Sequence, residues 1–139
     1  MNGQPVRIDP KDIKAQQQVE RLLSCEGLRR DPHLDYTCGI FDDKWNLLAT
    51  GSCFRNTLRC LAVSKSHRGC GLLSRVVNHL IEVQALRGHF HLFLYTAQQN
   101  IRYFEDLGFC VIVKTENGLA FMENRLSGFA DYLHGLSGQ

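Results

Sequence analysis

The feature that most constrains the fold is one continuous segment of the chain. It consists of a predicted strand, then a loop with two glycines, then a long predicted helix. Residues Thr57–Val63 are typical of a β-strand, and the loop Ser64-Lys-Ser-His-Arg-Gly-Cys-Gly71 follows directly. After Gly71, apolar side chains recur every three to four residues, which predicts an amphipathic helix. They are Leu72, Leu73, Val76, Val77, Leu80 and Val83. A strand that leads through such a loop into a helix indicates a fold in which helices pack on a sheet.

The loop has the chemistry of a phosphate-binding turn. Glycine permits unusual backbone dihedrals and the close approach of a ligand, and the start of a helix presents main-chain N–H groups with a favourable dipole. Arg68 can add a charge-assisted contact to phosphate. Tight turns also use glycine for structural reasons alone. The loop therefore predicts a phosphate site, and a purely structural turn is the alternative.

The rest of the chain alternates predicted strands and helices in the order β-α-β-β-β-α-β-α-β-β-α. This order predicts a mixed sheet with helices packed on it, of class α+β or α/β. Before the strand–loop–helix segment we expect a strand at 6–8, a helix capped by Asp9 and opened by Pro10, and a hairpin of 36–41 and 47–54. After it we expect a central strand at 91–95 buried on both faces and a short helix at 100–107 closed by Gly108. A hairpin of 111–114 and 119–122 around Asn117-Gly118 and an amphipathic helix at 129–136 complete the chain.

Length and composition exclude several classes of protein. The chain has 139 residues, which predicts one domain spanning 1–139, and its net charge of +2 is too small to indicate nucleic-acid binding. Neither a signal peptide nor an apolar run long enough to cross a membrane is recognisable. The six cysteines form no CxxC pair and fit no zinc-binding spacing, so we expect free thiols, no metal site and a cytoplasmic protein.

Two motifs resemble those of the GNAT acetyltransferase superfamily. Cys60-Leu-Ala-Val-Ser64 followed by Arg68-Gly-Cys-Gly71-Leu-Leu resembles its pyrophosphate-binding motif, and Tyr103-Phe-Glu-Asp-Leu-Gly-Phe109 resembles its second motif. The expected order of elements also agrees with that family over nearly the whole chain. The resemblance implies the GNAT fold, which is a mixed, mostly antiparallel sheet with a central, splayed parallel pair, flanked by helices. It implies acetyl-CoA or CoA as the ligand.

The resemblance also implies positions for the ligand. In that family the end of the fourth strand binds the pantetheine arm through its main chain, and the corresponding residues here are Leu61, Ala62 and Val63. The residues whose amides would hold the pyrophosphate are Arg68, Gly69, Cys70, Gly71, Leu72 and Leu73. The chain departs from the pattern at Ser66, where glutamine or arginine is usual. It departs again at Phe104, where a tyrosine often protonates the departing thiolate. Phe104 is expected at the cofactor site without a catalytic role, and no catalytic residue is assigned.

A narrower resemblance covers residues 60–124 and includes His91-Leu-Phe-Leu-Tyr-Thr96 and Phe121-Met-Glu-Asn124. These segments resemble the N-terminal domain of the citrate lyase ligase family, which acetylates a CoA-derived thiol on the acyl carrier subunit of citrate lyase, using acetate and ATP. The resemblance implies a dephospho-CoA-derived prosthetic group as ligand and the citrate lyase acyl carrier protein as partner. That family carries a nucleotidyltransferase domain after this region. Neither a P-loop nor the corresponding His-containing motif occurs here, so either an excised domain or a short homologue is expected.

Three functions remain open from the sequence. An amine acceptor has a pKa near 10, so its acetylation usually needs a general base. The strand Thr57–Val63 contains no carboxylate to serve as one. A thiol acceptor has a pKa of about 8.5 and needs less help. We therefore favour a domain that presents a carrier thiol for acetylation, with a stand-alone acetyl-CoA-dependent N-acetyltransferase and a non-catalytic CoA-sensing module as alternatives.

Overall fold

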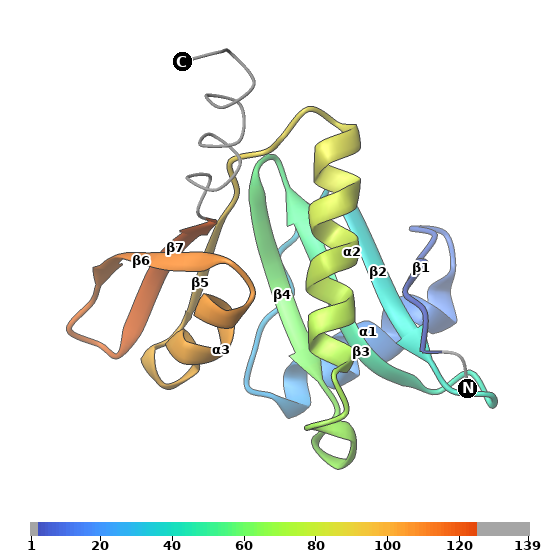
Figure 1. Cartoon of the computed structure of the whole chain (residues 1–139). Coiled ribbons are helices and arrows are strands. Elements are labelled where there is room, and N and C mark those ends of the chain that lie inside the picture. Colours follow the sequence, from blue (N-terminus) through green and yellow to red (C-terminus); the bar gives the residue numbers. More distant parts are fainter. Residues whose placement is uncertain (1–2, 125–139) are drawn as a thin grey trace. The chain divides into compact units, whose positions relative to one another are not determined.

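The computed structural model of the chain describes residues 3–124, which fall into two compact units divided between Phe90 and His91 (Figure 1). The elements of the N-terminal unit are β1 (Val6–Arg7), α1 (Ile13–Cys25), β2 (Tyr36–Phe41), β3 (Leu47–Phe54), β4 (Thr57–Val63), the 3-10 turn η1 (Lys65–His67) and α2 (Leu72–Leu86). Those of the C-terminal unit are β5 (Phe93–Ala97), the 3-10 turn η2 (Gln98–Asn100), α3 (Ile101–Asp106), β6 (Phe109–Lys114) and β7 (Leu119–Asn124). The division between the units thus falls in the segment that joins α2 to β5.

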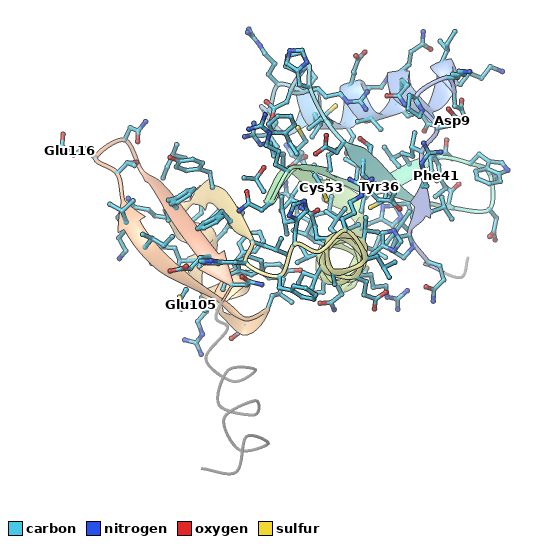
Figure 2. All side chains as sticks on the ribbon, turned by 90° about the horizontal axis from the view of Figure 1, so that it is seen from above. Asp9, Tyr36, Phe41, Cys53, Glu105 and Glu116 are labelled. Carbon is cyan, nitrogen blue, oxygen red and sulfur yellow. The ribbon has the colours of Figure 1, made fainter. Side chains whose placement is uncertain are left out.

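The sheet of the N-terminal unit has the order β1-β2-β3-β4, and all neighbours are antiparallel. Strand β3 is buried from Leu47 to Cys53 because α1 covers one face of the sheet and α2 the other (Figure 2). On the α1 side, Val19 and Leu23 pack with Leu47 and Ala62. The predicted hairpin of β2 and β3 and the predicted strand β4 are confirmed.

A glycine in β3 lets α2 lie close to the sheet. A Cβ atom on Gly51 would lie 2.5 Å from Cγ1 of Val76, 2.8 Å from Cδ2 of Leu61 and 2.9 Å from Cδ1 of Leu80. Real Cβ atoms essentially never show such contacts, so a side chain here would force Val76, Leu61 or Leu80 to shift. Val76 and Leu80 of α2 thus lie directly over Gly51, next to Leu61 of β4.

The expected cap of the first helix is wrong by one turn. Helix α1 begins at Ile13, and the carboxylate of Asp12 accepts a hydrogen bond from the Ala15 amide at 3.1 Å. Asp9 instead closes a turn around Pro10, with its carboxylate accepting from the Lys11 amide at 2.8 Å and its carbonyl from the Asp12 amide at 3.0 Å. Both aspartates satisfy main-chain amides, but only the second stands where the helix begins.

The C-terminal unit has strand order β5-β7-β6, with antiparallel neighbours. The predicted hairpin is confirmed, and Gly118 adopts φ 88° in its turn. The strand expected at 91–95 runs from Phe93 to Ala97 and is not buried on both faces: Leu94 is buried, whereas Tyr95 is 64% exposed. An aromatic residue continues an apolar run in the sequence, but here Tyr95 only packs against Phe121 across the strand pair. The helix predicted at 129–136 lies outside the described residues.

Candidate functional site

Strand β4 carries a bulge where the segment expected to bind the carrier arm begins. Ser52 pairs with Arg59 and Thr50 with Ala62, so Gly51 lies opposite two residues of β4. One of these is Cys60, whose φ of 55° is unusual for a residue other than glycine. Such a bulge bends the strand and re-aims the residues after it. No local sequence signal predicts it.

The side chains of residues 61–63, the segment predicted to bind the carrier arm, are buried or half-buried. Ala62 is 4% exposed and belongs to the core under α1. Leu61 points toward α2, next to the space above Gly51. Val63 pairs with Ala49 in the sheet. That this segment binds a ligand through its main chain stays a prediction.

The loop between β4 and α2 is open at both of its glycines. It begins with the turn η1, which the His67 amide closes by donating to the Ser64 carbonyl at 2.9 Å. Gly69 and Gly71 have φ of 81° and 77°, and a Cβ atom on either would meet nothing within 4 Å. Their conformation therefore favours glycine, and no atom of residues 3–124 fills the space beside them.

The first turn of α2 presents its amides at this loop. Gly71 is the N-cap residue and has no side chain to accept from these amides. The backbone bond that opens the helical pattern runs from the Arg75 amide to the Gly71 carbonyl at 3.2 Å. The amides before Arg75 are those that a helix leaves without intrahelical partners. Open space, glycine and helix-start amides together fit the phosphates of a CoA-type ligand.

The six predicted pyrophosphate-binding residues are thus contiguous, but their side chains differ. Leu72 is 3% exposed and can offer only its main chain. Cys70 is exposed on the loop. The guanidinium of Arg68 forms an ion pair with the carboxylate of Glu26, just beyond the end of α1. This pair joins residues 42 positions apart, so no local pattern could reveal it. A phosphate approaching Arg68 would meet a guanidinium that already has a partner.

Phe104 belongs to the C-terminal unit and is part of its core. It is 4% exposed, and its ring meets that of Tyr103 edge-on at 5.4 Å and that of Phe109 edge-on at 6.4 Å. The fold therefore explains why an apolar ring is accommodated at position 104.

A tyrosine–histidine pair in the N-terminal unit was not anticipated from the sequence. The Tyr36 hydroxyl on β2 lies 2.6 Å from Nε2 of His79 on α2. Burial lowers the pKa of His79, although Glu82 opposes this, and burial raises the pKa of Tyr36. At neutral pH the pair is therefore an uncharged hydroxyl beside an uncharged imidazole.

Two buried cysteines, Cys38 and Cys53, lie next to this pair. Cys53 is the strand partner of Tyr36, and Figure 2 shows the two beside each other close to α2. Burial raises the pKa of Cys38 and of Cys53 to about 12. All six cysteines are free thiols, as predicted.

Metal-binding clusters and membrane-spanning helices are both absent from residues 3–124. No three His, Cys, Asp or Glu side chains of this part of the chain lie close enough together to hold a metal ion. Over the same residues, no helix is both long enough and apolar enough to span a membrane.

Known proteins resemble this chain in sequence. Residues 10–109 match the model of the acetyltransferase (GNAT) family. The citrate (pro-3S)-lyase ligase of Escherichia coli K12 is 28% identical over 130 residues, which cover 91% of this chain and 37% of that protein. The corresponding ligase of Haemophilus influenzae is 24% identical over 106 residues, which cover 76% of this chain and 32% of that protein. The chain thus spans about a third of the length of these relatives.

Solved structures share the fold at low sequence identity. An aminoglycoside 6'-N-acetyltransferase complexed with coenzyme A has a TM-score of 0.72 at 17% identity and covers 86% of this chain and 95% of its own. The ribosomal-protein-S18-alanine N-acetyltransferase of Escherichia coli has a TM-score of 0.62 at 19% identity and covers 86% and 91%. The expected fold, a mixed and mostly antiparallel sheet with flanking helices, is confirmed. By its family match and its fold, the chain belongs to the acetyltransferase (GNAT) family.

Proposed function

We propose that this chain binds a CoA-type ligand at the start of α2 and serves acetyl transfer to a thiol, as part of a citrate lyase ligase. The observation that carries the proposal is the loop at Gly69 and Gly71, where the backbone takes positive φ beside space that residues 3–124 leave open. The pyrophosphate would lie against the amides of Arg68 to Leu73, near the helix dipole. The pantetheine arm would follow the main chain of Leu61 to Val63.

A thiol acceptor suits the groups that the chain provides. Strand β4 carries no carboxylate that could act as a base, and Phe104 has no hydroxyl for a leaving thiolate. A carrier thiol would lose its proton to solvent and attack the carbonyl carbon of an activated acetate. If the donor is acetyl-adenylate, the phosphate leaves with its bonding electron pair and needs no protein acid. Adenylation itself would come from a nucleotide-binding domain outside residues 1–139.

The similarity to ligases supports this proposal over its rival. The ligases of Escherichia coli and Haemophilus influenzae match most of this chain. The rival function, acetyl-CoA-dependent N-acetylation by the chain alone, draws on the names of the structural neighbours, which at 17% and 19% identity indicate the fold alone. A citrate lyase acyl carrier protein bearing a CoA-derived group would be the partner under the favoured proposal.

The test compares wild type with Phe104→Tyr, using acetyl-CoA and a panel of amines. We expect little or no acetyl-CoA consumption by the wild-type chain, because an expelled CoA thiolate would lack a proton donor. Phe104→Tyr should leave CoA affinity unchanged and should raise any residual turnover on amines. A carrier thiol should be acetylated only when an adenylating domain is supplied. Robust wild-type turnover on an amine would establish the rival function instead, and thermal melts would verify that the variant is folded.

A further inference from the structure

A cavity lies wholly within the N-terminal unit, and its lining includes none of residues 61–73. Its volume is about 490 Å³, within the range of sites for small molecules. Helix α1, the ends of β1 and β2, and the segment after α1 form its walls. Its polar lining includes Arg7, Gln16, Glu20, Arg30, Asp31, Asp35 and Thr37.

Arg30 is the distinctive group of this cavity. Its guanidinium donates to Oε1 of Gln16 on α1 and, at 3.4 Å, to Oγ1 of Thr37 on β2. Thr37 is itself held by a 2.9 Å hydrogen bond to the buried hydroxyl of Ser52. The two end nitrogens of the guanidinium are therefore fixed by neutral oxygens on two different elements. This arrangement orients the group before any ligand arrives.

Arg30 forms no ion pair within residues 3–124, where no carboxylate lies within 4.0 Å of its guanidinium. Two acids that line the cavity have other partners. Asp31 pairs with Arg59 at 3.0 Å, and the Asp35 carboxylate accepts from the Arg55 amide at 2.5 Å. Glu20 is exposed. A half-buried guanidinium normally has a carboxylate or phosphate partner, because removing its charge from water is costly.

We propose that this cavity binds a small organic carboxylate whose oxygens are held by Arg30. A planar guanidinium matches a carboxylate through parallel N–H···O bonds. A phosphate dianion would call for more positive charge than one fixed arginine and the exposed Arg7 provide. The inference is independent of CoA binding, since the cavity shares no residue with the loop at the start of α2.

The probe is succinate, titrated into the 15N-labelled full chain, with chemical shifts followed at Arg30 Nε, the Gln16 side-chain amide and the Thr37 amide. The first test variant is Gln16→Glu, which places a carboxylate on Arg30 from within the chain. It also costs the 2.9 Å bond from Gln16 to the Asp9 carbonyl. Its matched control is Gln17→Glu, the same charge change on the exposed neighbouring residue. We expect saturable succinate binding that Gln16→Glu weakens about tenfold or more, since charge-assisted hydrogen bonds are lost, and that Gln17→Glu changes less than about twofold.

A second pair of variants removes the cation itself. Arg30→Met should weaken succinate binding about tenfold, and Arg29→Met, an exposed neighbour, should change it less than about twofold. Equal weakening by both members of either pair would overturn the proposal, because it would show only general charge attraction. Absence of saturable succinate binding to the wild type, or tighter binding of inorganic phosphate at the same resonances, would overturn it as well. The wild-type titration decides even if Arg30→Met fails to fold.

Discussion

Two positions next to helix α2 are occupied by glycine for opposite structural reasons: one is tightly packed and the other is open. Gly51, under the middle of the helix, leaves room for Val76, Leu61 and Leu80, which a Cβ atom would meet at 2.5–2.9 Å. Gly71, at the start of the helix, has φ 77° and open space where a Cβ atom would lie. At Gly51, side chains of the protein occupy the space that a Cβ atom would need. The second glycine provides a place that residues 3–124 leave empty, next to the amides at the start of the helix.

The other end of α2 sharpens this contrast. Gly88 also has positive φ, at 84°, and also faces open space. There, however, the amides close the helix: Gly88 donates to the Ala85 carbonyl at 3.0 Å and His89 to the Gln84 carbonyl at 2.8 Å. A left-handed glycine is thus no mark of a binding site by itself. The open amides at Gly71 make the difference.

The largest difference is expected in the rates at which thiol reagents modify exposed cysteines, such as Cys70 in the loop, and buried cysteines in the sheet. With a pKa of about 12, Cys38 and Cys53 are thiolate in roughly one molecule in ten thousand at pH 8. We expect Ellman's reagent to modify the exposed Cys25 and Cys70 at least about a thousandfold faster than the two buried thiols. CoA should slow the reaction of Cys70 and leave that of Cys25 unchanged. Rapid labelling of all six cysteines in the folded chain would contradict the assigned burial.

Gly51→Val should lower the free energy of unfolding by about 3 kcal/mol, because the new side chain overpacks the interface between β3 and α2. Gly51→Ala should cost less, about 1–2 kcal/mol, since it adds a single methyl group. Urea denaturation with a circular-dichroism signal measures both. Unchanged urea midpoints would mean that α2 can move off the sheet freely. Gly51 would then not be required for packing, contrary to its role in the comparison with Gly71.

The smallest expected effect is the pH dependence of stability that comes from His79, which lies on the same helix. Its folded-state pKa is lowered, so the unfolded chain binds the proton more readily. The contribution of His79 to the free energy of unfolding should therefore be complete above about pH 6.5, the ordinary pKa of histidine. It should decrease as the pH falls toward the lowered pKa of the folded state. Because the side chain is only partly buried, we expect less than about 1 kcal/mol. His79→Gln should flatten this pH dependence, whereas the exposed His33→Gln should not; equal profiles for both would contradict the assignment.

The sequence predicts well whatever is set by local patterns. Strand β4, helix α2 and the two hairpins follow from period-3.6 spacing, from alternation and from Asn117-Gly118, and their positions are confirmed. The α1 cap is misplaced because Asp9 and Asp12 are both good caps, and only the turn at Pro10 decides between them. For the site, the loop and its glycines are visible in the sequence.

What the sequence could not supply depends on pairs far apart in the chain. The Arg68–Glu26 ion pair joins residues separated by 42 positions and the Tyr36–His79 pair by 43. The bulge at Cys60 depends on the register between β3 and β4, where one residue faces two. None of these leaves a trace in residue spacing, because each is determined by how α1, α2 and the sheet pack together.

The central claim, that the empty space at Gly71 is kept for a ligand, is tested most directly by calorimetry of CoA binding to Gly71→Val and Gly88→Val. Both variants place a β-branched residue at positive φ in open space, so both should lose similar stability. We expect CoA to bind the wild type and Gly88→Val equally, and to bind Gly71→Val at least about fivefold more weakly, a loss of about 1 kcal/mol. Unchanged CoA affinity in a folded Gly71→Val, or an equal loss in both variants, would contradict the claim.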